Sequence, residues 1–534
     1  MKKLLSFFEG RSISKRFFLV LCSAVLFALS FPNPLVRGGI GVLGFFALLP
    51  IFPVIRHSSW KTIWLYGLYH GFASYALYNF WLATFHPLAI FIVPPIYAFY
   101  GIFLFLALKL AIYFFPNRGY ILQTFIWVAY EYLKTTGFLG YPYGIIGYSQ
   151  YAFIPFIQIA SLGGVWPVSL MVVFPSAFWG NLLASSNVSL SLKQEKIPAL
   201  VYVGLFTLIL IYGFFSQVDY SASPTWRVAL VQHNKDPWKG GLVAYRDGFN
   251  RLRRLSEDAI KESPDLDAVI WSETAFVPSL YWHMYVRTNP LSTRLVEELL
   301  AYLESRKGYT FVFGNDDGRP VRIDDGKVER IDYNGVYAYI NGKLSEPPYR
   351  KLHLVPFTEH FPYEKQLPFL YNLLKNADTH FWEKGTDYTI FDDGKARFFT
   401  LVCFEDTFGY LAREFIKRGA QVIINVGNDS WAGVVSNEMQ HMTVALFRAI
   451  ENRRFFARAT NGGMTVVISP NGRILAQLEP FTEDYLIYDI PVYDSVTTLY
   501  TLWGDWFAYL SLYASVLALA AGFVLRLIKK GRAD

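Results

Sequence analysis

Three residues with acid–base or nucleophilic side chains lie beside apolar segments that are typical of buried strands. Glu273 and Cys403 each follow a short apolar run, and Lys351 comes shortly before a segment that contains proline. Functional groups in open α/β sheets gather at the carboxyl ends of strands, so we expect the three side chains to lie close together. A thiol nucleophile, a carboxylate that takes its proton and a cation that stabilises an oxyanion are the parts needed for acyl transfer.

The hypothesis of acyl transfer depends most on the thiol of Cys403. The chain has two cysteines, and Cys22 lies in the first apolar stretch, so a disulfide scaffold is excluded. We expect a helix to begin just after Cys403, and a helix N-terminus lowers the pKa of a thiol. The backbone N–H of Phe404 is a second candidate oxyanion donor. Taken singly, a strand-end carboxylate, lysine or cysteine is more often structural, and only the combination favours catalysis.

The segment that carries these residues alternates between two periodicities. Short apolar runs alternate with longer amphipathic ones, which predicts an α/β sandwich. Asn471 and Gly472 lie between two apolar runs and predict a hairpin turn. Strands are expected at 226–232, 268–271, 309–313, 335–340, 397–402, 422–425, 464–468 and 485–490, and helices at 240–263, 291–306, 407–418 and 437–459.

The rest of the chain predicts a membrane protein. Of its 534 residues 53% are hydrophobic and only 17% charged, whereas soluble domains carry about 25% charged residues. A span needs about 20 apolar residues. We expect a membrane domain at 1–217 with seven transmembrane helices, a globular domain at 218–500, and a last span with a cytoplasmic tail at 501–534. Candidate spans lie at about 17–35, 38–55, 62–84, 88–115, 120–136, 159–187, 198–217 and 503–527.

The basic residues predict the orientation of these spans. The net charge of +7 comes largely from the two termini, and lysine and arginine beside spans mark the cytoplasmic side. Eight spans with both termini inside place 218–500 on the outer face, which in a bacterium is the periplasm. No nucleic-acid partner is expected, because the globular domain lacks a basic stripe with interleaved aromatic residues. Four ionisable residues fall at membrane depth and are candidates for function: His70, Lys109, Glu131 and Lys134.

The order Glu, Lys, Cys with these flanking residues resembles the nitrilase superfamily, whose fold is a four-layer αββα sandwich. A nitrilase-like domain inserted before the last of eight spans is similar to the bacterial apolipoprotein N-acyltransferase family. The resemblance rests on segments 271–275, 351–359, 402–405, 428–431, 458–461 and 147–150. It implies that Glu273 is the base, Lys351 the electrophilic stabiliser and Cys403 the nucleophile. It also implies supporting roles for Glu359 and Glu405, and places near the site or its loops for Asn334, Trp238, Trp431, Glu451 and Arg454.

The function implied by this resemblance is transfer of an acyl chain from a phospholipid, through a thioester on Cys403, to the α-amine of an S-diacylglyceryl-cysteine apolipoprotein. It further implies a monomer in the bacterial inner membrane with its catalytic domain in the periplasm. We expect no cofactor, and the spacing of the histidines predicts no metal site. Two alternatives remain: a membrane-tethered nitrilase-type amidase that hydrolyses a small amide, and a transporter or binding protein with a silent domain. Glu451 and Arg454, three residues apart, have the alternative reading of a surface ion pair.

Overall fold

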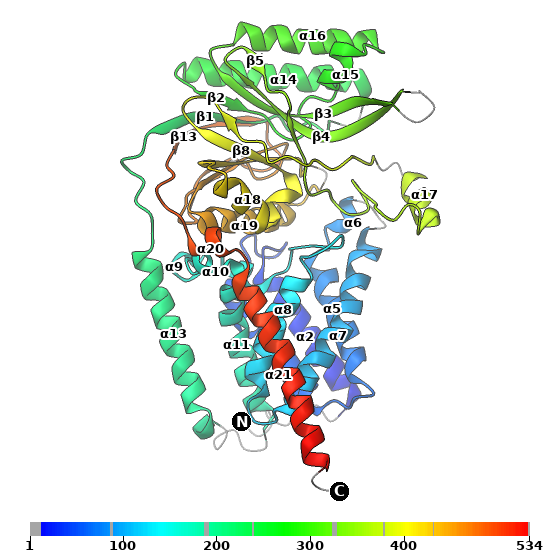
Figure 1. Ribbon diagram of the computed structural model, residues 1–534, viewed down its shortest axis with the longest axis vertical. Helices are drawn as coiled ribbons and strands as arrows, with labels where there is room; N and C mark the ends of the chain where they lie inside the picture. Colours follow the sequence, from blue (N-terminus) through cyan, green and yellow to red (C-terminus); the bar gives the residue numbers. More distant parts are fainter. Residues whose placement is uncertain are drawn as a thin grey trace. The chain divides into compact units, whose positions relative to one another are not determined.

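The computed structural model describes residues 12–85, 89–185, 192–237, 240–322, 328–376, 380–430 and 432–531. The chain divides into two compact units (Figure 1). Unit 1 contains 1–217, 434–447 and 498–534, and unit 2 contains 218–433 and 448–497. Each unit is described separately.

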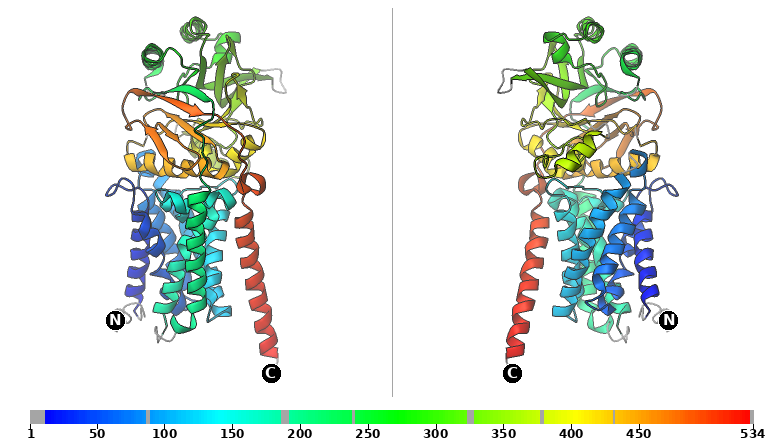
Figure 2. Two further views of the ribbon diagram at one scale, coloured as in Figure 1. Left: turned by 90° about the vertical axis from the view of Figure 1, so that its left-hand side faces the viewer. Right: turned by 90° about the vertical axis from the view of Figure 1, so that its right-hand side faces the viewer.

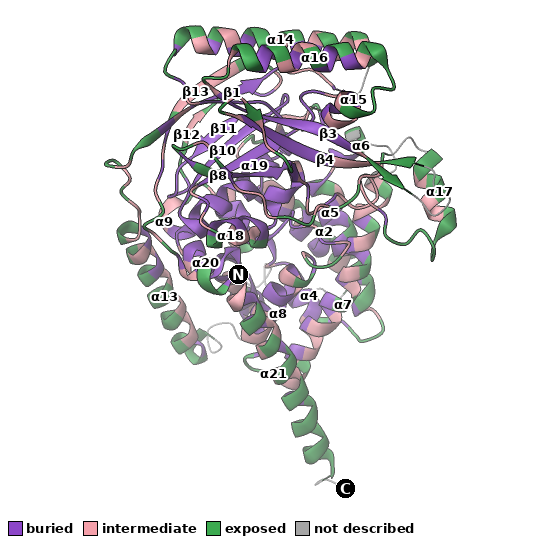
Figure 3. Cartoon of the chain, turned by 45° about the horizontal axis from the view of Figure 1, so that its top comes forward, coloured by how far each residue is buried: buried purple, intermediate pink, exposed green. Residues whose placement is uncertain are grey.

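Unit 1 is helical. Among the described residues, five helices are long and apolar enough to cross a membrane, and they run roughly alongside one another in both side views (Figure 2). They are α2 (Ile13–Ser30), α7 (Val93–Phe114), α11 (Val165–Leu183), α13 (Lys196–Phe215) and α21 (Trp506–Gly531). Many side chains of α13 and α21 are exposed and apolar (Figure 3), as expected for helices that face lipid.

The remaining candidate spans form shorter helices. The apolar stretch 38–55 is broken into three short elements, with Pro50 capping the last of them. The number of spans therefore remains a prediction beyond these five. The shorter elements are η1 (Gly41–Leu43), α3 (Gly44–Ala47), α4 (Ile51–His57), α5 (Ile63–Tyr78), α6 (Leu82–Phe85), η2 (Ala89–Phe91), α8 (Gly119–Leu133), η3 (Ile146–Gln150), α9 (Ile154–Ile157), α10 (Ala160–Gly163) and α20 (Leu499–Trp503).

Small residues and buried polar groups hold unit 1 together. A side chain at Gly67 of α5 would come within 2.3 Å of the Gly101 carbonyl oxygen of α7, so these helices cross in backbone contact. Lys134 donates to the Tyr143 carbonyl oxygen (2.8 Å) and to the Tyr75 hydroxyl. Glu131 accepts from the Ile146 N–H at 2.8 Å. These contacts fix the segment 141–150, which is largely buried within unit 1.

One piece of unit 1 comes from far along the chain. Residues 434–447 form most of α19 (Val435–Asn452) and pack with the membrane helices. The buried amide of Gln440 accepts from the Trp81 indole N–H at 2.9 Å and donates to the carbonyl oxygens of Pro32 (2.9 Å) and Tyr78 (3.2 Å). A buried amide needs such partners, so Gln440 fixes the position of α19 among the ends of these helices.

Unit 2 is built on two sheets. In the first, β1, β2 and β3 are parallel, and β13 and β4 pair antiparallel at its two sides. In the second, β8, β9 and β10 are parallel, and β7 and β11 are antiparallel to their neighbours. The first sheet has the order β13-β1-β2-β3-β4-β5 with β6 beside β4, and the second β12-β11-β10-β9-β8-β7.

The strands of the first sheet are β1 (Thr225–Gln232), β2 (Ala268–Ile270), β3 (Thr310–Arg322), β4 (Val328–Ile340), β5 (Lys343–Leu344), β6 (Tyr349–Arg350) and β13 (Asp484–Pro491). The strands of the second are β7 (Phe391–Asp392), β8 (Arg397–Val402), β9 (Val422–Gly427), β10 (Phe455–Thr460), β11 (Val466–Ile468) and β12 (Ile474–Gln477). The helices of unit 2 are α14 (Gly241–Glu262), α15 (Leu280–Tyr285), α16 (Pro290–Ser305), α17 (Pro368–Asn376) and α18 (Gly409–Lys417), with the 3-10 turn η4 (Cys403–Thr407).

Side-chain alternation along β8 joins the layers of unit 2. Phe398 stacks on Trp226 of β1 in the first sheet, with ring centroids 4.9 Å apart. Its neighbour Phe399 points to the opposite face, where it stacks on Phe415 of α18 at 4.3 Å. Helices α14 and α16 cover the other face of the first sheet (Figure 1). The layers are therefore helix, sheet, sheet and helix, as the sandwich prediction requires.

Two local predictions had different outcomes. The hairpin turn is confirmed: Gly472 has φ +77° and its N–H donates to the Ser469 carbonyl oxygen, between antiparallel β11 and β12. The helix predicted at 437–459 is wrong at its end, because α19 stops at Asn452 and 455–460 forms the buried strand β10. Arg453 turns the chain there with φ +52°, which a sequence pattern does not reveal.

Candidate active site

The three predicted catalytic residues lie just past the ends of strands in unit 2. Glu273 comes three residues after β2, Lys351 directly after β6 and Cys403 directly after β8. The backbone has positive φ at Cys403 (+49°) and at Thr274 (+46°), beside Glu273. Non-glycine residues rarely adopt this conformation, and it persists only where the surrounding structure imposes it. The fold therefore holds the backbone at Cys403 and beside Glu273 in defined conformations.

The amine of Lys351 joins two carboxylates. Its side chain is fully buried, and Nζ lies 2.8 Å from Glu359 Oε1 and 3.6 Å from Glu273 Oε1. Glu359 in turn accepts from the Val355 N–H at 2.8 Å, which fixes the loop that carries it. A buried lysine needs such partners, because an uncompensated buried charge is costly. The prediction that Glu359 supports the site agrees with this geometry.

Asn334 connects the base to the lysine. Its side-chain amide donates to Glu273 Oε1 at 2.8 Å, and its carbonyl oxygen accepts from the Lys351 N–H at 2.9 Å. Strand β3 passes close behind Glu273: a side chain at Gly314 would come within 2.3 Å of the Thr274 nitrogen. Only glycine fits there, so β3 and β4 together fix the orientation of the Glu273 carboxylate.

Glu405 connects the segment that follows Lys351 to the turn that begins at Cys403. Oε1 accepts from the N–H groups of Leu352 (2.6 Å) and His353 (2.9 Å). Oε2 accepts from the Val402 N–H and the Tyr349 hydroxyl, both at 2.8 Å. Burial raises the pKa of Glu405 to about 7, although these donors favour the carboxylate. The predicted supporting role is therefore a structural clamp between two catalytic segments.

We expect Glu405→Gln to cost both stability and activity. The amide group has one acceptor oxygen where the carboxylate has two, so at least one buried donor among Val402, Leu352, His353 and Tyr349 faces an NH2 group. Leaving buried donors unmet costs about 1–3 kcal/mol each. Thermal unfolding should shift to lower temperature and acyl-transfer activity should fall more than tenfold. An unchanged melting temperature would show that Glu405 does not hold these two segments together.

The pKa of the Cys403 thiol differs from the expectation. Cys403 begins the short 3-10 turn η4, and the α-helix behind it starts only at Gly409. Burial raises the pKa of the Cys403 thiol well above its usual value, the carboxylates of Glu273 and Asp429 raise it further, and Lys351 opposes them. The predicted lowering of this pKa by a helix N-terminus is therefore wrong. A raised pKa keeps Cys403 a neutral thiol, so a nucleophilic role for it would need a base.

This protonation state predicts the pH dependence of alkylation. Only the thiolate reacts with iodoacetamide, and a raised pKa keeps the thiolate fraction small. In a Cys22→Ala background the rate should rise about tenfold per pH unit from pH 7 to 9 without reaching a plateau. The same protein unfolded in denaturant should approach its plateau near the ordinary thiol pKa. A plateau below pH 8 in the folded protein would show a stabilised thiolate.

Burial and the neighbouring carboxylates shift the other two groups. Burial raises the pKa of Glu273, and the Lys351 charge opposes this effect. Burial alone would lower the pKa of Lys351, but the carboxylates of Glu359 and Glu273 raise it above its usual value. The lysine therefore remains a cation. The site thus contains a thiol, a carboxylate with proton affinity higher than usual, and a fixed positive charge, which suits nucleophilic acyl transfer.

This chain is similar to known proteins over nearly its whole length. Residues 227–498 match the carbon-nitrogen hydrolase family, and residues 23–178 match the apolipoprotein N-acyltransferase N-terminal domain. The chain is 41% identical to apolipoprotein N-acyltransferase 1 of Treponema denticola, over 96% of this chain and 97% of that protein. It is 41% identical to the Treponema pallidum protein of the same name, over 97% of each. The Borreliella burgdorferi apolipoprotein N-acyltransferase is 30% identical over 92% of this chain and 93% of its own.

The chain belongs to the apolipoprotein N-acyltransferase family. The predicted resemblance is thereby confirmed, as is the nitrilase-like nature of the globular domain. Family membership and the five apolar helices make this chain a membrane-associated acyltransferase. The roles of the individual site residues rest on the geometry above and remain predictions.

Some members of the predicted site lie elsewhere or outside the described residues. Glu451 is buried and pairs with Arg448 at 2.7 Å, and Arg448 donates to the Thr407 carbonyl oxygen at 3.0 Å, at the end of the cysteine turn. Arg454 is also buried and donates to the Val496 carbonyl oxygen at 2.7 Å. The surface ion pair between Glu451 and Arg454 is therefore wrong. Trp238 and Trp431 lie outside the described residues, and Phe404 as an oxyanion donor remains a prediction.

Three charged residues beside Cys403 received no role from the sequence, although Asp429 and Arg458 lie in segments 428–431 and 458–461, which carry the resemblance. The Cys403 thiol donates to Asp429 Oδ1 at 3.9 Å. Asp429 Oδ2 lies 2.5 Å from Arg458 Nη2, and the other end of that guanidinium lies 2.7 Å from Asp406. All three are almost fully buried. An arginine within an apolar run was the available signal, but the helix predicted across 458 concealed it.

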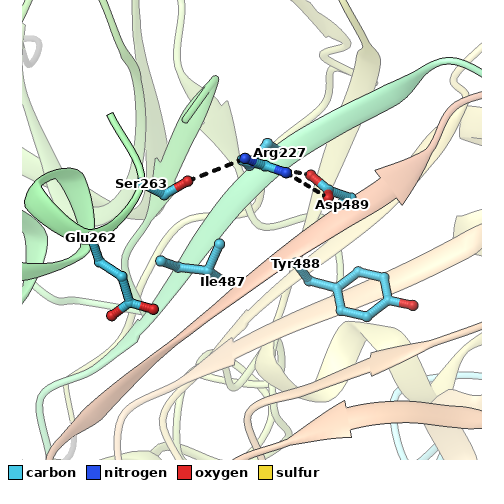
Figure 4. Close-up of a pocket in the computed structure, with 6 residues that line it drawn as sticks. All are labelled: Arg227, Glu262, Ser263, Ile487, Tyr488 and Asp489. Atoms are coloured by element: carbon cyan, nitrogen blue, oxygen red, sulfur yellow. Dashed lines mark hydrogen bonds and ion pairs between the residues drawn. The ribbon is translucent and has the colours of Figure 1, made fainter. Parts of the chain in front are cut away.

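Arginine side chains also pair with acidic residues in two other polar groups of unit 2. Among the described residues, Asp316, Asp332 and His380 are the one group that has metal-ligand spacing, but Arg330 already pairs with Asp316 (3.1 Å) and Asp332 (2.6 Å). A surface hollow beside β1 and β13 is lined by Arg227, which binds Asp489 through both carboxylate oxygens (Figure 4). In both groups an arginine compensates the acidic side chains.

Proposed function

We propose that this protein transfers an acyl chain from a phospholipid to the N-terminal α-amine of an S-diacylglyceryl-cysteine apolipoprotein. The observation that carries the proposal is the set formed by buried Glu273, buried Lys351 and half-buried Cys403, found in a chain whose relatives are named apolipoprotein N-acyltransferase. Five apolar helices give such a site a reason to be attached to a membrane, because both proposed substrates are lipids.

The first half-reaction would use all three residues. Glu273 takes the proton of the Cys403 thiol, and the sulfur attacks the ester carbonyl carbon of the phospholipid. Lys351 stabilises the tetrahedral oxyanion, since a fixed buried charge acts strongly there. The C–O bond breaks, Glu273 returns its proton to the leaving oxygen, and a lysophospholipid departs. The acyl chain remains as a thioester on Cys403.

The second half-reaction would release the product. The α-amine of the apolipoprotein attacks the thioester carbonyl carbon, a C–N bond forms and the C–S bond breaks. One amine proton passes to the sulfur, which restores the thiol. This ping-pong course needs no cofactor, because Cys403 itself carries the acyl group between the two lipids.

The proposed location follows from the distribution of charge. If both termini lie in the cytoplasm, the predicted spans put Arg56, Lys61, Arg118 and Lys196 in loops on the cytoplasmic side of a bacterial inner membrane. Lys134 is buried and donates to the Tyr143 carbonyl oxygen, so it does not count as a loop charge. The excess of basic residues on one side favours a periplasmic catalytic domain.

Transfer and hydrolysis are separated by the fate of a labelled acyl chain. Detergent-solubilised protein is incubated with phospholipid labelled in its acyl chains, and then with a peptide that begins with S-diacylglyceryl-cysteine. We expect the label on the α-amine of the peptide, and none there with the Cys403→Ala variant. Release as free fatty acid in the presence of the peptide would instead favour a membrane-tethered hydrolase and contradict the proposal.

A further inference from the structure

The carboxylate of Asp429 lies beside the nucleophile. Asp429 follows β9, is 1% exposed, and its Oδ1 accepts the Cys403 thiol at 3.9 Å. Its other oxygen is fixed by Arg458, which is fully buried between Asp429 and Asp406. The position of Asp429 is therefore determined by a rigid ion pair on one side and by the reacting sulfur on the other.

The negative charge of the Asp429 carboxylate does not help the first half-reaction. The guanidinium of Arg458 faces the carboxylates of both Asp406 and Asp429, and the Asp429 carboxylate lies beside the Cys403 sulfur. A negative charge there disfavours the thiolate and is one cause of the raised pKa of Cys403. An anion that opposes formation of the nucleophile stabilises a cation at the same place.

Acylation of Cys403 changes what Asp429 contacts. The S–H bond is replaced by an S–C bond, so Oδ1 loses the thiol as a hydrogen-bond donor. A carboxylate oxygen readily accepts from an N–H group. The second substrate brings a free α-amine, which at neutral pH is largely an ammonium, to the thioester at this point.

We propose that Asp429 binds the α-ammonium of the acceptor beside the Cys403 thioester and takes its first proton. This rests on the function proposed above and identifies the acceptor subsite. One proton of the ammonium passes to Asp429 and then to water, which leaves a neutral amine. That amine attacks the thioester; its second proton passes to the sulfur as the C–S bond breaks, and the third stays on the amide.

The test compares the two half-reactions in the full-length protein. The rate of thioester formation with labelled phospholipid and the rate of transfer to a diacylglyceryl-cysteine peptide are measured separately in single turnovers. In Asp429→Asn the ratio of transfer to thioester formation should fall about 100-fold, the usual scale for a positioned base. Asp429→Glu, which keeps the carboxylate, should recover part of this ratio.

Two controls make the result specific. Asp406→Asn neutralises the other carboxylate on Arg458 and belongs to the same ion-pair network, so it should lower the ratio, but less than Asp429→Asn does, since Asp406 is not assigned to the amine. Hydroxylamine, an amine that is uncharged at neutral pH, should cleave the thioester of Asp429→Asn almost as fast as that of the wild type.

Other outcomes of these experiments would contradict the assignment of Asp429 to the acceptor amine. The assignment is overturned if Asp429→Asn leaves the ratio unchanged, or if this variant slows cleavage by hydroxylamine as much as it slows transfer to the peptide. It is also overturned if neither Asp429→Asn nor Asp429→Glu forms a thioester. If the wild-type protein forms no thioester, the proposed function fails and the subsite fails with it. If the wild type transfers label normally and only these comparisons fail, the subsite alone is wrong.

Discussion

Replacing Lys351 with methionine should abolish acyl transfer and destabilise the catalytic domain in the same variant. The ammonium is fully buried, 2.8 Å from Glu359 and 3.6 Å from Glu273. Its removal leaves two neighbouring carboxylates without their shared cation, which costs about 3–5 kcal/mol of unfolding free energy. Loss of the oxyanion charge adds a decrease of about 100-fold or more in the rate of thioester formation.

Single-turnover acylation and thermal unfolding measure these two effects. Lys307→Met is the matched control, because Lys307 is exposed just past the end of α16 and pairs with Glu304 at 3.3 Å, and an exposed ion pair contributes little. A Lys351→Met protein with the melting temperature of the wild type would show that the lysine does not bridge the carboxylates.

Glu273→Gln should separate activity from stability. The amide cannot take the thiol proton, so thioester formation should slow by about 10²–10⁴-fold. The fold should tolerate the change, because Asn334 can still donate to the remaining oxygen and a buried charge is removed. The folded pKa of Glu273 is raised, so its ionised form weakens the fold as pH rises above the ordinary carboxyl pKa, and glutamine avoids that loss.

The measurements are acylation rate and melting temperature at pH 5 and pH 8. Glu298→Gln provides the control, since Glu298 pairs with Arg246 at the surface, 2.8 Å away. Thioester formation at the wild-type rate in Glu273→Gln would exclude Glu273 as the base. The catalytic set thus predicts opposite stability effects for its cation and its base.

Much of the catalytic set could be predicted from the sequence because strand ends are visible as breaks in apolar runs. Glu273, Lys351 and Cys403 each follow a strand or its short extension, and in the structure Lys351 lies beside Glu273. The sandwich layers were also predictable, since the alternation along β8 places Phe398 and Phe399 on opposite faces.

The electrostatics of the site could not be predicted in the same way. The pKa of Cys403 depends on burial, on Glu273 and on Asp429, which follow other strands, so the helix expected after Cys403 predicts the wrong direction. The position of Arg458 could not be predicted, because the helical pattern of the sequence continues past Arg453. In the structure a left-handed turn at Arg453 ends the helix, and Arg458 lies in a buried strand. Long-range contacts of this kind leave no periodic signal.

The most direct test of the account is the search for an acyl thioester on Cys403. The purified protein is incubated with phospholipid that carries a labelled acyl chain, quenched without an acceptor, digested and analysed by mass spectrometry. We expect a peptide containing Cys403 whose mass is increased by one acyl group; hydroxylamine should release this group, and Cys403→Ala should lack it. Transfer to a diacylglyceryl peptide without any adduct on Cys403, or with undiminished yield in Cys403→Ala, would contradict it.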